Sequence, residues 1–187
     1  MSPQSPQQLR SGILLIAAAG MFDPNFGRSV VLLCEHQAKG SFGLVLNQRL
    51  DATMSDLIET CDWDSPVYRG GPVELGALHF IHCRDDIDVG SHEVLPGVFW
   101  GGDFVKLNRL LSEGVLTPEE CRFFLGYSGW GEGQLQNELE HEGWYLCSAS
   151  RELVFKQDSA DFWRQTLKQM GPDYKILSTF PDDPRMN

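Results

Sequence analysis

Apolar runs alternate with short polar stretches along the whole chain and predict a mixture of strands and helices. The run at residues 13–18 is continuously apolar, which is typical of a strand covered on both faces. Residues 29–34 and 42–47 are rich in strand-forming side chains, and Lys39-Gly40-Ser41 between them predicts a hairpin. Further extended segments are expected at 67–69, 77–83, 97–100 and 144–147, with another apolar segment at 121–127.

Helical signals are fewer and lie mainly in the second half of the chain. Helices are expected at residues 53–60, 103–113, 134–142 and 158–170. Thr53 and Asp158 are the expected N-caps of the first and last of these helices, and Gly171-Pro172 is the expected stop. The acidic stretch 84–96 is expected to be a loop.

The order of these elements predicts the fold class. Strands and helices are mixed without a regular βαβ alternation, and at least one hairpin is present, which favours an α+β fold with a mixed or mainly antiparallel sheet. A length of 187 residues, 42% of them hydrophobic, fits one domain with a substantial core. We expect a flexible arm at 1–12, a single domain at 13–180 and a short tail at 181–187.

The net charge of the chain restricts the classes of partner that it is expected to bind. Acidic residues outnumber basic ones by 26 to 15, and the formal net charge is -11. Nucleic-acid binding needs Lys and Arg to displace counterions from phosphates, and the arginines here are scattered. Direct DNA or RNA binding is therefore disfavoured, and the same charge disfavours adhesion to anionic lipid.

The cysteines and the first apolar run bear on localisation. Five cysteines occur without a CxxC pair, which is typical of reduced thiols in a cytoplasmic protein. Arg10 followed by the apolar run up to Ala19 also resembles a signal peptide. We favour a buried first strand because the run has the minimum length for a signal peptide. No run approaches the ~20 apolar residues of a membrane span.

Four motifs in series, over roughly residues 13–170, resemble the AlgH/YqgE family of bacterial proteins. The resemblance is carried by Leu15-Ile16-Ala17, Asp23-Pro24, Phe26, Arg28-Ser29-Val30-Val31, Cys34-Glu35-His36, Gly43-Leu44-Val45-Leu46-Asn47, Gly70-Gly71-Pro72-Val73, Gly126-Tyr127-Ser128-Gly129-Trp130, Gly133-Gln134-Leu135, Trp144 and Trp163-Arg164. One departure is Ala77-Leu78-His79, where the family commonly has Arg-Gly-Phe before a strand histidine, although His82 still falls at that histidine.

The resemblance implies a single α+β domain whose bifurcated sheet curls into a barrel-like shape with flanking helices. It implies no known reaction. Some members carry the label "transcriptional regulator", but no recognised DNA-binding motif accompanies it.

The glycine-rich segment from Gly126 to Gly133 is the best ligand candidate from the residues alone. A strand, a glycine-rich stretch and a helix start at Gln134 could cradle an anion with backbone N–H groups. The alternative is a tight structural turn, which Trp130 and Glu132 favour because they interrupt the glycines. The segment also fails the hydrolase pattern Gly-x-Ser-x-Gly, so Ser128 is a poor candidate for a nucleophile.

Two sets of His and Cys residues could pair or bind a metal. Cys34 and His36 are two apart and would share one face of a strand, although a core thiol beside a surface histidine is the favoured interpretation. His79 and Cys83 share a face that His82 does not, so these residues do not converge locally. We therefore expect no metal and no cofactor.

The Asp23–Ser29 turn brings a second group of polar residues together. Asp23 and Arg28, with Glu35 and Asn47 nearby on the hairpin, could line a polar cleft. Alternatively they satisfy buried backbone groups and form an internal ion pair, which is the interpretation that we favour. The candidate binding residues, taken together, are Asp23, Arg28, His36, Asn47, Gly70, Gly71, Ser128, Gly129 and Gln134.

Three functional hypotheses follow. The leading one is a non-enzymatic regulatory or binding protein that acts through contacts with another protein, since no catalytic constellation assembles in the sequence. The second is a small-molecule or anion binder, or an enzyme, that uses the Gly126–Gly133 segment. The third is a direct DNA-binding regulator. The large aromatic residues are Trp100, Trp130, Trp144, Trp163, Phe99, Phe123 and Phe124. Most of them should lie in the core, and several exposed together would mark a partner surface.

Overall fold

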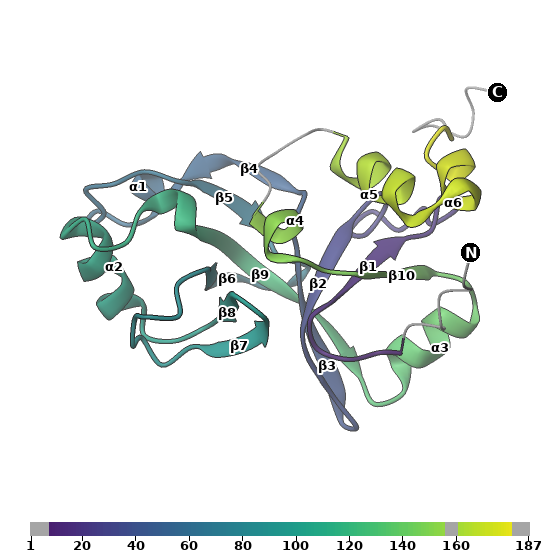
Figure 1. Cartoon of the computed structure of the whole chain (residues 1–187), viewed down its shortest axis with the longest axis horizontal. Coiled ribbons are helices and arrows are strands. Elements are labelled where there is room, and N and C mark those ends of the chain that lie inside the picture. The colour runs from purple at the N-terminus through teal and green to yellow at the C-terminus, as the bar shows by residue number, and fades with distance from the viewer. Residues whose placement is uncertain (1–7, 156–160, 181–187) are drawn as a thin grey trace.

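A computed structural model describes residues 8–155 and 161–180 of the chain (Figure 1). Its strands are β1 (Ile13–Ala17), β2 (Val30–Gln37), β3 (Gly40–Val45), β4 (Arg49–Thr53), β5 (Pro66–Arg69), β6 (Val73–His82), β7 (His92–Leu95), β8 (Val98–Trp100), β9 (Cys121–Gly131) and β10 (Trp144–Ser148). Its helices are α1 (Met54–Leu57), α2 (Phe104–Ser112), the 3-10 turn η1 (Pro118–Glu120), α3 (Gln134–Glu140), α4 (Arg151–Phe155), α5 (Phe162–Met170) and α6 (Pro172–Leu177).

The strands form one forked sheet in the order β10-β1-β2-β3-β9-β6-β8-β7. The fork lies at β9, whose first half pairs with β5 and whose second half pairs with β3. The β5–β9 pair is parallel, and every other pair between described strands is antiparallel. The α+β class and the bifurcated sheet are therefore confirmed. The described sheet ends at β10 and β7 without joining them, so it curls but does not close into a barrel.

Two adjacent glycines allow the chain to cross β9 at the fork. A Cβ atom on Gly70 would lie 2.2 Å from the carbonyl oxygen of Gly126. A Cβ atom on Gly71 would lie 2.2 Å from the carbonyl carbon of Tyr127. No side chain fits at such distances, so only glycine lets β5 run into the crossing.

The continuous apolar run of β1 is explained by layers on both of its faces. Ile13 and Leu15 pack in one cluster with Leu135 of α3, whereas Leu14 and Ile16 pack in another cluster that includes helix α5. Figure 1 shows β1 and β2 between α3 on one side and α5 with α6 on the other. A third cluster lies under α2, on the other branch of the fork. The prediction of a first strand covered on both faces is confirmed.

Several boundaries differ from the sequence-based expectations. The stretch 84–96 contains β7, which pairs with β8, so it is not wholly a loop. The helix expected at 53–60 is only the short α1, although Thr53 is its N-cap. Gly171-Pro172 ends α5 but also begins α6, with proline in its first turn. The expected cap Asp158 lies outside the described residues.

Candidate functional site

The glycine-rich segment belongs largely to a strand. Residues 126–131 form the second half of β9. Gly126 has a φ of 68°, and a Cβ atom on it would lie within 2.9 Å of the carbonyl oxygens of Gly71 and Val73. Ser128 is fully buried, and its Oγ donates to the carbonyl of Gly70 at 3.0 Å. These contacts hold the crossing of β5 over β9. They leave the Ser128 hydroxyl shielded from solvent.

The turn into α3 does not present an open cradle of N–H groups. The side-chain Oε1 of Gln134 accepts from the backbone N–H of Gly131 at 3.0 Å, and so occupies the position where an anion would bind. Helix α3 is seven residues long, which is too short to assemble a sizeable helix dipole. The favoured interpretation of a structural turn fits this geometry.

The Asp23–Ser29 turn is built as its sequence indicates. The Oδ1 atom of Asp23 accepts from the amides of Asn25 and Phe26, at 2.8 and 3.1 Å. Asn47 clamps the turn to the hairpin: its Oδ1 accepts from the amide of Val30 at 2.9 Å, and its Nδ2 donates to the carbonyl of Arg28 at 2.8 Å. Asn47 therefore satisfies backbone groups, as the favoured interpretation expected.

The charged side chains of this turn point in different directions. The Arg28 guanidinium lies 4.0 Å from the centre of the Trp163 ring and donates to the carbonyl of Phe180 at 3.2 Å. Among the ion pairs between described residues, none joins Arg28 to Asp23. The contacts of Arg28 fasten the turn to the C-terminal helices, whereas Asp23 stays within the turn.

His36 and Cys34 do not share a face, contrary to their spacing. The register between β2 and β3 shifts between Leu33 and Glu35, which reverses the alternation of side chains. Cys34 packs in the α5-side cluster, where burial raises the pKa of its thiol, whereas His36 lies on the α3 side. The His36 ring nitrogen Nδ1 is 2.7 Å from the hydroxyl of Ser41.

The histidines of β6 lie on opposite faces, as expected. His79 packs edge-on against Phe42 and Tyr127, and His82 stacks on Phe99 and contacts the Ser91 hydroxyl at 2.8 Å. Burial lowers the pKa of both histidines. In residues 8–155 and 161–180, no three His, Cys, Asp or Glu side chains gather as a metal-binding group would.

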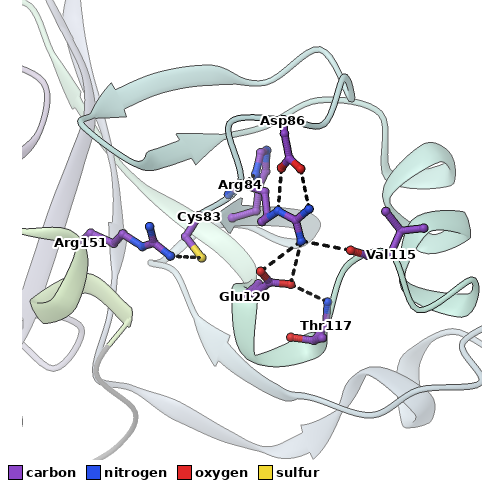
Figure 2. Close-up of polar contacts among 8 residues, drawn as sticks. Cys83, Arg84, Asp86, Val115, Thr117, Glu120 and Arg151 are labelled. Atoms are coloured by element: carbon purple, nitrogen blue, oxygen red, sulfur yellow. Dashed lines mark hydrogen bonds and ion pairs between the residues drawn. The ribbon is translucent and has the colours of Figure 1, made fainter.

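A charged network beside Cys83 braces the branch of the sheet that carries α2 (Figure 2). Arg84 pairs with Asp86 at 2.6 Å and with Glu120 at 3.3 Å, and its NH1 also donates to the carbonyl of Val115 at 3.1 Å. Arg151 reaches the Cys83 sulfur at 3.4 Å from the opposite side. These charges neutralise one another, so the network serves as a structural brace.

A pocket of about 330 Å³ opens between the Asp23–Ser29 turn, the end of β9 and helix α3. We call it the Glu138 pocket. Its lining residues come from four segments: Met21, Asp23, Phe26, Gly129, Trp130, Gln134, Glu138, His141, Gly143 and Trp144. Three of the nine candidate binding residues line it, namely Asp23, Gly129 and Gln134. His36 instead lines a separate hollow on the other side of α3, with Gln136.

The Glu138 carboxylate is held by neutral donors. The indole N–H groups of Trp130 and Trp144 both donate to its Oε2, at 3.0 and 2.8 Å. The amide of Gln134 donates to its Oε1 at 2.9 Å. Since none of these partners carries a charge, the carboxylate is oriented but not neutralised.

Three aromatic rings support this carboxylate. The Trp130 and Trp144 rings meet edge to face at 6.0 Å, and Phe26 packs on both, at 6.0 and 5.5 Å. Trp130 and Trp144 are 4% and 3% exposed, so their N–H groups depend on Glu138 for a hydrogen bond. The rings also tie the turn, β9 and β10 to helix α3.

Glu138 is the residue that the sequence interpretation missed. It follows Leu135 by three positions, so it lies on the buried face of α3 where an apolar side chain is expected. The sequence does contain a signal for this residue: it is a carboxylate on the apolar face of a short helix, and two tryptophans lie close to it along the chain. Trp130 and Trp144 lie in the core, as expected for most of the large aromatic residues.

The sequence profile described as AlgH-like matches residues 14–175. The chain is a member of the AlgH-like family. A UPF0301 protein of Chlorobaculum parvum is 43% identical over 182 residues, covering 97% of both chains. A UPF0301 protein of Cytophaga hutchinsonii is 41% identical over 181 residues, covering 96% of this chain and all of its own.

Two solved structures share the fold. The solution structure of AlgH from Pseudomonas aeruginosa is 27% identical, with a TM-score of 0.73, and covers 97% of this chain and 98% of that one. A crystal structure of a Corynebacterium diphtheriae protein has a TM-score of 0.80 at 23% identity, with 95% of each chain covered. None of the described helices of this AlgH-like chain combines the length and apolar character that crossing a bilayer requires.

Proposed function

We propose that this AlgH-like chain is a non-enzymatic regulatory or binding protein that contacts another protein through the Glu138 pocket. The observation that supports the proposal is the pocket itself, in which hydrogen bonds from two packed tryptophan rings fix a carboxylate. A site that is already ordered loses little conformational entropy when it binds.

The size of the pocket favours an anchor side chain from a partner. A volume of about 330 Å³ lies at the lower end of the range for small-molecule sites, roughly 300–1,000 Å³. Phe22, which is 69% exposed, lies in the chain between the lining residues Met21 and Asp23 and so adds apolar surface next to the pocket. An anchor side chain that fills a well-packed pocket is the usual arrangement of a protein-binding hot spot.

A direct DNA contact at this site is disfavoured by its charge. The lining includes the carboxylates of Asp23 and Glu138 and no Lys or Arg. Two carboxylates repel phosphate. A regulatory role would therefore act through a protein partner.

Site-specific photo-crosslinking tests the proposal with a matched control. A crosslinking amino acid replaces Phe22 at the pocket rim or Val105 on α2, which is 77% exposed and lies on the other branch of the fork. We expect a discrete protein adduct from position 22 in native cells and none from position 105. The proposal is wrong if both positions give the same adducts, or if the purified protein turns over a metabolite at this pocket.

A further inference from the structure

We propose that the Glu138 pocket binds the cationic head of its ligand, an ammonium or guanidinium group. The inference deepens the proposed function by naming the chemistry that the pocket accepts. It depends on the proposed function only for the source of the cation, which is either a Lys or Arg side chain of a partner protein or a free organic amine.

The first support is an uncompensated negative charge. Glu138 is half-buried, and its carboxylate accepts hydrogen bonds from two indoles and an amide. No ion pair between described residues includes it. Asp23 adds a second carboxylate at the rim. Opposite charge placed near these groups gains Coulomb energy that grows as water is displaced.

The second support is the hydration that the Glu138 carboxylate loses when any ligand fills the pocket. A ligand that fills the pocket removes water from the carboxylate. Burying an ionised carboxylate under a neutral group is unfavourable because nothing replaces its hydration. A cation compensates that loss, whereas an anion adds repulsion.

The third support is the aromatic lining. Phe26, Trp130 and Trp144 border the same cavity, and aromatic rings attract cations through the negative potential of their faces. Both indoles turn their positive N–H edges toward Glu138. The two tryptophan rings are almost fully buried, so the half-buried ring of Phe26 is the aromatic surface in the lining that is most open to a ligand.

The fourth support is rigidity. The two tryptophans are almost fully buried, and Gln134 is held by Gly131 as well as by Glu138. The carboxylate is thus oriented before any ligand arrives. A preorganised site of this kind needs little rearrangement to bind.

The test uses the full chain and defined probes at constant ionic strength. Tetramethylammonium, N-acetyl-lysine amide, N-acetyl-arginine amide and a short lysine-containing peptide are titrated against the protein, with tert-butanol as a neutral probe of similar shape to tetramethylammonium. Tryptophan fluorescence reports occupancy. We expect saturable binding of the cations, about tenfold or more tighter than the neutral probe, equivalent to ~1.4 kcal/mol.

Charge-removing variants assign the effect to the site. Glu138→Gln keeps an oxygen acceptor for the two indoles and should weaken cation binding about tenfold or more. Glu140→Gln removes an exposed charge from the same helix outside the pocket and should change binding less than about twofold. Asp23→Asn keeps the acceptor of the turn, removes the rim charge and provides a second test if the Glu138 variant is unstable.

The outcomes distinguish a partner side chain from a free amine as the source of the cation. They also distinguish cation binding from the proposed contact with a protein. Equal affinity for tetramethylammonium and the peptide indicates a free amine, and markedly tighter peptide binding indicates a protein side chain. Cation binding without a crosslinked partner keeps this inference and removes the proposed protein contact. The inference is overturned if tert-butanol binds as well as the cations, if no cation saturates, or if Glu138→Gln and Asp23→Asn both bind cations like the native chain.

Discussion

Replacing Glu138 by alanine removes the acceptor that the buried indole N–H groups of Trp130 and Trp144 share. Each buried donor left without a partner costs about 1–3 kcal/mol. Two such donors together would cost about 2–6 kcal/mol. Because the pocket is open to water on one side, we place the sum in the lower part of this combined range, roughly 2–4 kcal/mol. For a chain of this length, such a loss lowers Tm by about 4–16 °C.

Urea unfolding followed by tryptophan fluorescence, together with calorimetry, measures the effect. Glu138→Gln should cost less than half as much, because its carbonyl oxygen can accept from both indoles while its amide group loses the bond to Gln134. Glu140→Ala, on the exposed side of the same helix, should stay within about 0.5 kcal/mol of the native chain.

A double-mutant cycle separates the hydrogen bond from the loss of side-chain packing. Glu138→Ala combined with Trp130→Phe should show a coupling energy of about 0.5–3 kcal/mol, because Phe carries no N–H group to be left unpaired. A Glu138→Ala stability within about 0.5 kcal/mol of the native chain, or purely additive effects in the cycle, would refute the reasoning that the carboxylate secures the two indoles.

Contacts elsewhere in the fold give further predictions. Gly71→Ala should destabilise the fold by about 3 kcal/mol or more, since its Cβ would lie 2.2 Å from the backbone of β9. Gly76→Ala, with no atom within 4 Å of the added carbon, is the matched control and should be nearly neutral in the same urea titration. Asn47→Ala should lower the free energy of unfolding by about 2 kcal/mol, because the backbone amide of Val30 and the carbonyl of Arg28 lose their partner. An unchanged urea midpoint would contradict the role of Asn47 in holding the turn to the hairpin. Burial lowers the pKa of His79 and His82, so at acidic pH the unfolded chain binds protons that the folded chain does not. The contribution of these histidines to stability should be complete above about pH 6.5 and decline below it. His79→Phe should reduce that decline, measured as the difference between urea titrations at about pH 7.5 and 5.5.

The elements that the sequence predicts well are those whose signal is local. The continuous apolar run of β1 predicts burial on both faces, and α3 and α5 provide the two covers. The turn at Asp23 is equally local, since its side chain bonds to amides two and three residues later. Such features depend on a few consecutive residues, so the pattern contains all the information that they need.

The features that escape the sequence depend on distant partners. A register shift at Cys34 places His36 on the opposite face, and no residue type there announces it. The glycines after Leu125 suggest a ligand loop, yet the first of them, Gly126, lies where the backbone of Gly71 and Val73 leaves no room for a side chain. Close backbone approach and ligand binding select the same residue, so composition alone does not separate them.

The pocket could be predicted only in part. Asp23, Gly129 and Gln134 are on the sequence-based set of candidates and do line it, but from segments that are more than 100 residues apart along the chain. Glu138, which gives the pocket its charge, was not on that set. Its role follows from two indoles on different strands, β9 and β10, which only the folded sheet brings together.

The central claim is that a cation binds beside Glu138, and the indole N–H resonances of the five tryptophans test it most directly. In an NMR titration with tetramethylammonium, the signals of Trp130 and Trp144 should shift together along one saturable curve. The signals of Trp63 and Trp163 should stay in place, since these indoles donate to Asn108 and to the carbonyl of Ala17 away from the pocket. Unshifted Trp130 and Trp144 signals at saturating cation, or equal shifts at all five indoles, would contradict the account.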